Sequence, residues 1–276
     1  MQVVARLRRS LWGIRHECRF GLNELRRGKA AYLANVLAYR ILGLWPKMPG
    51  ANKTYCLETR EGDVLFYRRN RGDIQGIREI YIDEIYRLPD GAAPTSLVDF
   101  GANIGIATVW LSRRYDLTSS LSVEPVPQNF ALLERNLAAN HLSGATLQAA
   151  VGATNGTVMF DGTQETNMGR MGAGTLEVSL KEVNELVASL DFSPSLLKVD
   201  IEGAERDLFV TMKPHWAQAF SLIVIEVHPE HVDPSALEAA IIIEGFRYFP
   251  PKEVSSGINR SKRERLFIRQ PSTLSR

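Results

Sequence analysis

Hydrophobic residues recur at helical spacing over the first part of the chain, from Val3 to about Leu44. The repeat has two stretches, and steps of three and four residues place the apolar side chains of each stretch along one helix face. These positions are Val4, Leu7, Leu11 and Ile14, then Leu33, Val36, Leu37, Ile41 and Leu44. Residues 46–50 contain two prolines and a glycine, which end the pattern. The sequence therefore predicts a basic amphipathic helical arm over residues 1–50.

The next segment, residues 51–95, begins with patterns typical of short strands. Thr54 to Thr59 and Val64 to Arg68 are strand-like, and Glu61-Gly62-Asp63 between them predicts a turn. A helical pattern near Ile77 to Arg87 follows. We expect a small β-hairpin and a helix that lead into the main domain.

After Pro94, short apolar runs alternate with helical patterns, which predicts strands separated by helices and therefore a parallel sheet. The expected strands are Ser96 to Phe100, Leu121 to Glu124, Thr146 to Val151, Leu196 to Asp200, Leu222 to Val227, Phe246 to Phe249 and Arg265 to Arg269. The expected helices are Ile104 to Arg114, Gln128 to Asn140, Ala204 to Met212 and Pro234 to Glu244. The last two strands would close the sheet as a hairpin. The fold class is thus α/β, with a doubly wound, mostly parallel seven-stranded sheet over residues 96–276.

The composition agrees with one folded α/β domain and an appended segment, because 45% of the 276 residues are hydrophobic and 23% are charged. Cys18 and Cys56 are the two cysteines, and no Cys-x-x-Cys pair or histidine cluster accompanies them. A reducing, cytoplasmic location fits best. No run approaches the ~18 apolar residues of a membrane-spanning helix, and arginines interrupt any signal-peptide core near the start. We expect a protein that is neither secreted nor integral to a membrane.

The charge is unevenly distributed, since residues 1–50 hold ten Lys and Arg against Glu17 and Glu24 while the whole chain has a net charge of +2. Three roles for the arm stay open: packing on its own sheet, forming a homodimer interface, or making peripheral contact with an anionic membrane surface. Its apolar stripe favours the first two. Nucleic acid is not an expected partner, because the arginines lack interleaved aromatic residues and the rest of the chain is acidic.

The segment Leu97-Val-Asp-Phe-Gly-Ala-Asn-Ile-Gly105 runs from a buried strand into a helix, at the place where open α/β sheets bind ligands. A side chain at Gly101 would keep a ligand from the backbone, and Gly105 would let the helix pack closely. Asp99 could accept hydrogen bonds from loop amides or, through water, from a bound ammonium group. The dinucleotide fingerprint requires glycine where Asn103 stands, and Asp99 would repel a phosphate. The loop therefore favours a cationic sulfonium ligand, although a purely structural glycine turn stays open.

Glu124 ends the second predicted strand, about twenty residues after the loop, where a carboxylate can accept hydrogen bonds from both ribose hydroxyls. This feature implies a ligand that contains adenosine, and dinucleotide cofactors contain adenosine as well. Asn129 opens the next helix, and Ala150 and Val151 end the third strand, where an adenine ring would lie. Helix capping and core packing are the alternative roles for these three residues.

Charged residues gather at the ends of the fourth and fifth predicted strands. Strand alternation would place Lys198, Asp200 and Glu202 on one face, an arrangement that is costly in a buried strand and typical of a functional site. Glu226 and His228 would lie at the same edge. His228 could take a proton from an acceptor hydroxyl during methyl transfer, with the acids orienting the reactants.

Two other interpretations of this cluster stay open. Asp200, Glu226 and His228 could ligate a divalent metal ion, an arrangement that we favour less than the metal-free one. Lys198 could instead form a structural ion pair, with Glu202 capping a helix.

The stretch from about Cys56 to Ile268 resembles the FkbM family of methyltransferases. The resemblance rests on Val-Asp-Phe-Gly-Ala-Asn-Ile-Gly at 98–105, Val-Glu-Pro at 123–125, Leu-Lys-Val-Asp-Ile-Glu-Gly-Ala-Glu at 197–205 and Ile-Glu-Val-His at 225–228. It implies a class I methyltransferase fold, S-adenosylmethionine as cofactor and, in many members, O-methylation of sugars, polyketides or other natural products. It also implies that Asp73 and Tyr86 close over the cofactor.

The expected function is O-methylation of a small hydroxylated acceptor; a nucleotide-dependent oxidoreductase and a non-catalytic cofactor-binding scaffold are the alternatives. The predicted cofactor contacts are Asp73, Asp99, Gly101, Ala102, Asn103, Gly105, Glu124, Pro125, Asn129, Ala150, Val151 and Asp200. The predicted catalytic group is Lys198, Asp200, Glu202, Glu226 and His228. The long loop from Asp161 to Gly174 is predicted either to form a lid whose Asn167 and Arg170 contact the acceptor, or to be a plain connection.

Overall fold

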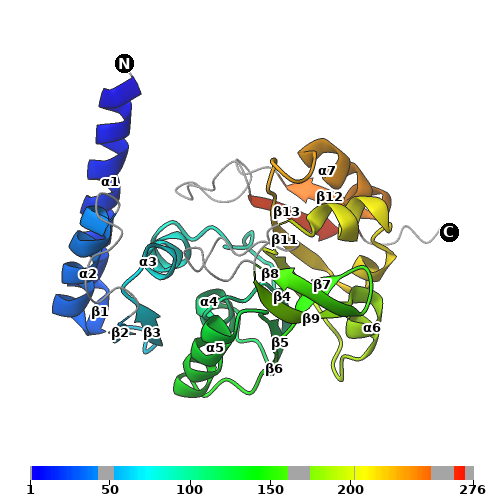
Figure 1. Cartoon of the computed structure of the whole chain (residues 1–276), viewed down its shortest axis with the longest axis horizontal. Coiled ribbons are helices and arrows are strands. Elements are labelled where there is room, and N and C mark those ends of the chain that lie inside the picture. The colour runs from blue at the N-terminus through cyan, green and yellow to red at the C-terminus, as the bar shows by residue number, and fades with distance from the viewer. Residues whose placement is uncertain (1, 43–52, 161–174, 202, 250–263, 271–276) are drawn as a thin grey trace.

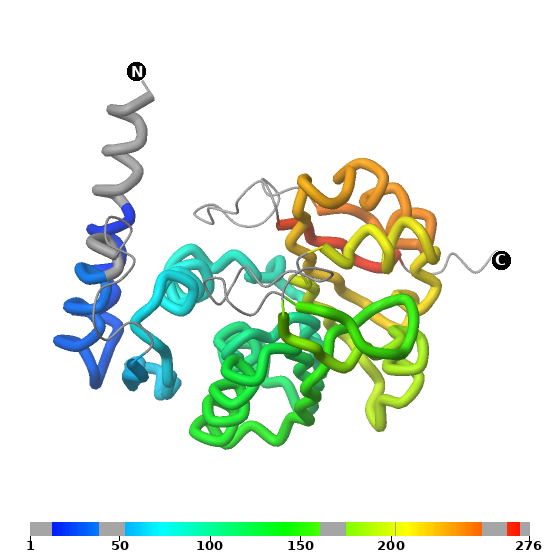
Figure 2. Tube along the Cα trace, viewed as in Figure 1, coloured from blue at the N-terminus to red at the C-terminus, as the bar shows by residue number. Residues whose placement is uncertain are grey.

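The computed structural model describes residues 2–42, 53–160, 175–201, 203–249 and 264–270 (Figures 1 and 2). Its centre is a seven-stranded sheet in the order β12-β13-β11-β10-β4-β5-β6. The strands are β4 (Ser96–Phe100), β5 (Ser119–Val123), β6 (Ala145–Leu147), β10 (Leu196–Val199), β11 (Leu222–Glu226), β12 (Phe246–Phe249) and β13 (Glu264–Arg269). The five from β11 to β6 are parallel, and β13 pairs antiparallel with β11 and β12. The predicted fold class is confirmed.

The winding reverses between β4 and β10, because the chain moves from β4 outward through β5 and β6 and then returns to add β10 and β11 on the other side. The carboxyl ends of β4 and β10 therefore flank the switch point at which such sheets bind ligands. The sheet is buried on both faces. Leu97 and Leu196 contribute to the apolar cluster on one face, and Val98 and Leu197 contribute to the cluster on the other.

Helices cover both faces of this sheet (Figure 1). They are α4 (Ile106–Arg114), α5 (Pro127–Ala139), α6 (Val183–Ala188) and α7 (Pro234–Ile243), with a π-helical turn η2 (Arg206–Thr211) and a 3-10 turn η3 (His215–Ala219). The prediction placed a helix from Ala204 to Met212, and the chain forms the wider η2 there.

The predicted third strand, Thr146 to Val151, is wrong as a single element. The chain turns after Leu147, where the amide of Ala149 donates to the Leu147 carbonyl, and β6 ends there. The remainder forms β7 (Ala150–Gly152) of a separate sheet with β8 (Gly156–Phe160) and β9 (Leu176–Glu182), in the order β7-β9-β8. The pattern gave no sign of β8 because most of its side chains are exposed and form no apolar run.

The N-terminal arm consists of α1 (Gln2–Asn23), the short strand β1 (Leu25–Arg27) and α2 (Lys29–Leu42). The predicted hairpin is present as β2 (Thr54–Thr59) and β3 (Val64–Arg68), and β1 extends it to three strands. Phe20 packs against Tyr32 and Tyr81, so this part of the arm is buried on its own chain. A homodimer or membrane role stays a prediction. No helix in the described part of the chain combines the length and the apolar character needed to cross a membrane.

The lead-in helix begins earlier than predicted. It comprises α3 (Arg71–Ile77), which continues as the π-helical turn η1 (Arg78–Ile82). The start is fixed by Asn70, whose side chain accepts a hydrogen bond of 2.8 Å from the amide of Asp73 and so caps the helix. Because the helix starts there, α3 and η1 lie over the carboxyl end of the sheet and contribute to the site described below.

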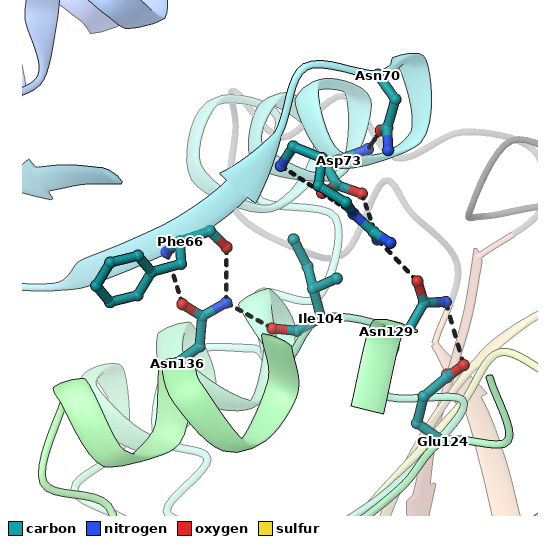
Figure 3. Close-up of polar contacts among 8 residues, drawn as sticks. Phe66, Asn70, Asp73, Ile104, Glu124, Asn129 and Asn136 are labelled. Atoms are coloured by element: carbon teal, nitrogen blue, oxygen red, sulfur yellow. Dashed lines mark hydrogen bonds and ion pairs between the residues drawn. The ribbon is translucent and has the colours of Figure 1, made fainter. Parts of the chain in front are cut away.

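Two asparagines, one on α5 and one at its C-terminal cap, hold the hairpin against the main domain. Asn136 accepts a hydrogen bond from the amide of Phe66 and donates to the carbonyls of Phe66 and Ile104 (Figure 3). One helical turn later, Asn140 makes the same pair of bonds to the backbone of Val64. These side-chain amides take the place of a neighbouring strand along β3, so the lead-in segment is firmly attached to the sheet domain.

Candidate functional site

The loop between β4 and α4 turns back over the end of β5. Gly101 has φ of +79°, and the amides of Gly101 and Ala102 both donate to the carbonyl of Val123. A Cβ atom at position 101 would lie 1.8 Å from the carbonyl oxygen of Asp200. Glycine is therefore required because the chain after β4 and the chain after β10 approach each other closely. This reason differs from the one expected from the sequence, namely that a side chain would keep a ligand from the backbone. At Gly105, where φ is +80°, a Cβ would meet Leu133 of α5 at 2.7 Å, which confirms the predicted close packing.

Asp99 and Lys198 form a buried pair under this loop. The Lys198 Nζ lies 3.0 Å from Asp99 Oδ1 and donates to the carbonyl of Gly101 at 2.7 Å. Thr108 donates to the other carboxylate oxygen of Asp99. Burial lowers the pKa of Lys198, but the charges of Asp99 and Asp200 outweigh it and raise the pKa above its ordinary value. Lys198 is therefore a charged residue that supports the loop, as in the structural alternative, and its catalytic role stays a prediction.

Glu124 follows β5 and is buried against the same loop. Its Oε2 accepts a hydrogen bond from the amide of Asn103, and its Oε1 accepts from the amide of Val126 and the side chain of Asn129. Burial raises the pKa of Glu124 to about 7, and these hydrogen bonds oppose the shift. The described contacts leave Oε2 able to accept from a further donor, as the predicted ribose contact requires.

His228 has a buried partner that the sequence analysis did not single out. The Nδ1 atom of His228 lies 2.6 Å from Oε1 of Glu205, a side chain with no exposed surface. Its Nε2 lies 4.0 Å from Asp200 Oδ1 and 3.8 Å from Glu226 Oε1. Burial lowers the pKa of His228, whereas the bond to Glu205 and the charges of Asp200, Glu205 and Glu226 raise it, for a net value of about 9. Glu205 was visible as the last acid of the 197–205 motif, but its partner lies 23 residues away in the sequence.

Carboxylates accumulate around the imidazole. Glu226 stands opposite Glu264 in the antiparallel pair of β11 and β13. Burial raises the pKa of Glu226 well above its ordinary value, and the charges of Asp200 and Glu264 raise it further. Burial likewise raises the pKa of Glu79, on η1, to about 7. Burial and like charges disfavour the ionised forms of these acids, and a bound cation would stabilise those forms.

A cavity of about 300 Å³ joins these groups. Its lining includes most of the predicted polar residues together with contributions from the lead-in helix. The predicted residues on it are Asp73, Gly101, Ala102, Asn103, Lys198, Asp200, Glu226 and His228, and Tyr86 joins them. Arg71, Glu79 and Glu230 also line it and were not predicted.

Other predicted contacts lie away from that cavity lining. Glu124 and Asn129 are buried behind the loop, and Ala150 and Val151 are buried in β7, so their contacts with a cofactor stay predictions, as does that of Pro125. Glu202 and the predicted lid from Asp161 to Gly174 lie outside the described residues.

The residues present fit S-adenosylmethionine. Its sulfonium and ammonium groups suit a cavity bordered by Asp200, Glu226 and Glu79, and the turned loop at Gly101 presents its backbone to that cavity. Among the residues that the structure describes, no set of three or more His, Cys, Asp and Glu side chains is arranged to hold a metal ion.

Comparison with known proteins identifies relatives of this chain. The family model for the methyltransferase FkbM domain matches residues 99–248. The chain is 27% identical over 230 residues to methyltransferase sdnD of Sordaria araneosa, covering 68% of this chain and 88% of that protein. It is 26% identical over 198 residues to methyltransferase 1 of Beauveria bassiana (strain ARSEF 2860), covering 61% and 79%. The solved structure of M. capricolum TrmK with S-adenosyl-homocysteine matches at a TM-score of 0.42 and 10% identity, covering 68% of this chain and 66% of that chain.

Proposed function

This chain belongs to the methyltransferase FkbM family and is an S-adenosylmethionine-dependent methyltransferase, and we propose that it methylates a hydroxyl oxygen of a small-molecule acceptor. The family match favours methyl transfer over the nucleotide-dependent oxidoreductase that the loop pattern left open. A non-catalytic scaffold is distinguished by turnover, since it would bind the cofactor without transferring its methyl group.

The hydrogen bond between Glu205 and His228 is the observation that carries this proposal. A buried carboxylate that accepts from Nδ1 leaves Nε2 of the same ring as the position that can take a proton. That atom faces the cavity side of the cluster, where Asp200 and Glu226 lie about 4 Å away. The arrangement provides an oriented base next to acids that can hold a hydroxylated ligand.

When bound, the cofactor supplies a methyl group already activated by the positive charge on its sulfur. The protein's task is then to align the acceptor oxygen and to remove its proton. Nε2 of neutral His228 would take the proton of the acceptor hydroxyl, and Glu205 would stabilise the resulting imidazolium. Asp200 and Glu226 accept hydrogen bonds from the acceptor and keep the oxygen oriented.

The pKa of His228 sets a clear pH dependence. A group with a pKa of about 9 is largely protonated at neutral pH, so the neutral base becomes more abundant as the pH rises toward 9. We therefore expect kcat to increase over this range and to level off above it.

The test is a screen of hydroxylated sugars and polyketides for a cofactor-dependent mass gain of one methyl group. With an acceptor in hand, His228→Ala should remove turnover and leave affinity for S-adenosyl-homocysteine within a few fold, and Asp200→Asn should also remove turnover. His215→Ala is the matched control, because His215 is also paired with a carboxylate, Glu244, and does not line the cavity. Wild-type turnover in the His228 variant would refute the assignment of the base.

A further inference from the structure

We propose that Arg68, on the lead-in hairpin, acts through Asn129 to position Glu124 for the ribose of the cofactor. Arg68 belongs to β3 and lies outside residues 99–248, the part of the chain that matches the family model. The inference rests on the cofactor of the proposed function and is independent of the acceptor and of the base. Arg68 and Asn129 are positioning residues here, because they act on the ligand through Glu124.

The three side chains form a continuous buried chain. Arg68 Nη2 donates to Asn129 Oδ1 at 2.7 Å, and Asn129 Nδ2 donates to Glu124 Oε1 at 3.1 Å (Figure 3). All three residues are at least nine-tenths buried. Arg68 and Glu124 come from separate segments of the chain that the docking of β3 on α5 brings together.

The chemistry of Arg68 fixes which way the amide of Asn129 faces. A guanidinium has only donors, so it requires the amide oxygen on its side and turns the amide nitrogen toward Glu124. Without Arg68, the amide could rotate and place its oxygen against the carboxylate, where two acceptors repel each other. Glu124 would then lose one of its two donors on Oε1, and the amides of Val126 and Asn103 would hold its carboxylate less firmly.

Asp73 holds Arg68 in place. Its two carboxylate oxygens accept from Nε and Nη2 of Arg68 at 2.9 and 3.0 Å, and Oδ2 also accepts from the Arg68 amide. This fork-shaped pair leaves the guanidinium little freedom, and Asn70 fixes Asp73 in turn. Asp73 was predicted to contact the cofactor itself. In this inference it acts indirectly, because it holds Arg68, which orients Glu124 through Asn129.

The experiment measures binding of S-adenosyl-homocysteine and of its 2′-deoxyadenosyl analogue by calorimetry. Because Glu124 is the ribose acceptor, the wild type should prefer the first ligand. In Asn129→Ala, affinity for S-adenosyl-homocysteine should fall by about tenfold, the effect of weakening one hydrogen bond to a charged group, while affinity for the analogue changes much less. The preference for the 2′-hydroxyl should therefore shrink toward one.

Removing Arg68 alone would leave Asp73 buried without its cation and could unfold the protein. The double variant Arg68→Met with Asp73→Asn avoids this problem and should show the same loss of preference. Arg69→Met is the matched control: Arg69 is the next residue along the chain and contacts Asn35 and Tyr55 instead. Thermal unfolding of each variant shows whether it is folded.

The outcomes separate this inference from the proposed function. Equal weakening of both ligands would indicate a purely structural role and overturn the inference, as would unchanged preference in Asn129→Ala and the double variant. A wild type that binds neither ligand would overturn the cofactor assignment itself.

Discussion

Replacement of Gly101 by alanine tests the arrangement of the switch point directly. Gly101 has φ of +79°, and a Cβ atom there would lie 1.8 Å from the carbonyl oxygen of Asp200. That oxygen belongs to the backbone, and the amide of Asp200 is itself bonded to the carbonyl of Phe100 at 2.9 Å. Neither strand end can move without disturbing the other.

Two physical effects contribute to the expected loss of stability. The left-handed conformation costs an alanine about 1–2 kcal/mol relative to glycine. Relief of the collision requires a backbone shift, which adds about 1–3 kcal/mol by the measure of overpacked cores. The free energy of unfolding should therefore fall by about 2–5 kcal/mol.

Gly91 supplies a control for the first effect alone. Its φ is +84°, and a Cβ there meets nothing within 4 Å, so Gly91→Ala should cost only about 1–2 kcal/mol. Urea unfolding of both variants gives the difference, and calorimetry with S-adenosyl-homocysteine should show weakened binding for the Gly101 variant only. Equal losses of stability in the two variants would refute the close approach of the strand ends.

Three further predictions follow from individual contacts. Glu205→Gln should lower the pKa of His228 from about 9 toward its ordinary value of 6.5, because a neutral amide stabilises the imidazolium less than a carboxylate does. The pH–rate profile for kcat measures this pKa, and an unchanged profile would contradict the pairing. Affinity for S-adenosyl-homocysteine should rise as the pH increases through 7, because Glu124 and Glu79 both have a pKa of about 7 and their ionised forms bind the ligand better. Calorimetry should show a weaker pH dependence in Glu124→Gln than in the wild type, and an equal dependence in the two proteins would count against the role of Glu124. Asn136→Ala should reduce the free energy of unfolding by about 2–4 kcal/mol, because the backbone amide and carbonyl of Phe66 lose their partners. Urea unfolding measures this loss, and a negligible loss would disprove the prediction.

The pH dependence of stability has a definite sign. The pKa of His228 is raised from 6.5 to about 9 in the folded protein, so its contribution to stability is complete below pH 6.5 and is lost as the pH rises through 9. The pKa of Glu124 is raised from 4.5 to about 7, so its contribution is likewise lost between these values. Thermal unfolding temperatures should decline from pH 6 to pH 9, and less steeply in His228→Ala. A wild-type stability that increases over this range would contradict the assignment.

Site residues that a local sequence pattern marks were predicted, whereas residues whose role depends on a distant partner were not. Gly101, Asn103, Asp200 and His228 were predicted because each stands at the end of an apolar run, and parallel strands bring such ends to one edge. Glu205 was not singled out, because nothing local distinguishes a buried histidine partner from a helix-capping acid. Lys198 was grouped with the catalytic residues by strand alternation. The structure pairs Lys198 with Asp99 on the neighbouring strand, a contact that the strand pattern did not indicate, and its catalytic role stays a prediction.

The sequence by itself determined most of the strands and helices of the main domain, the mostly parallel seven-stranded fold and the position of the ligand loop. These features follow from hydrophobic periodicity and from glycine, which act over a few residues. Only the tertiary structure decided that Thr146 to Val151 divides between two sheets and that Arg68 reaches Asn129. The contact of Arg68 with Asn129 depends on the packing of β3 against α5, and the division of the strand depends on which neighbours its two halves pair with. Local sequence encodes neither, because both depend on where the partner lies in space.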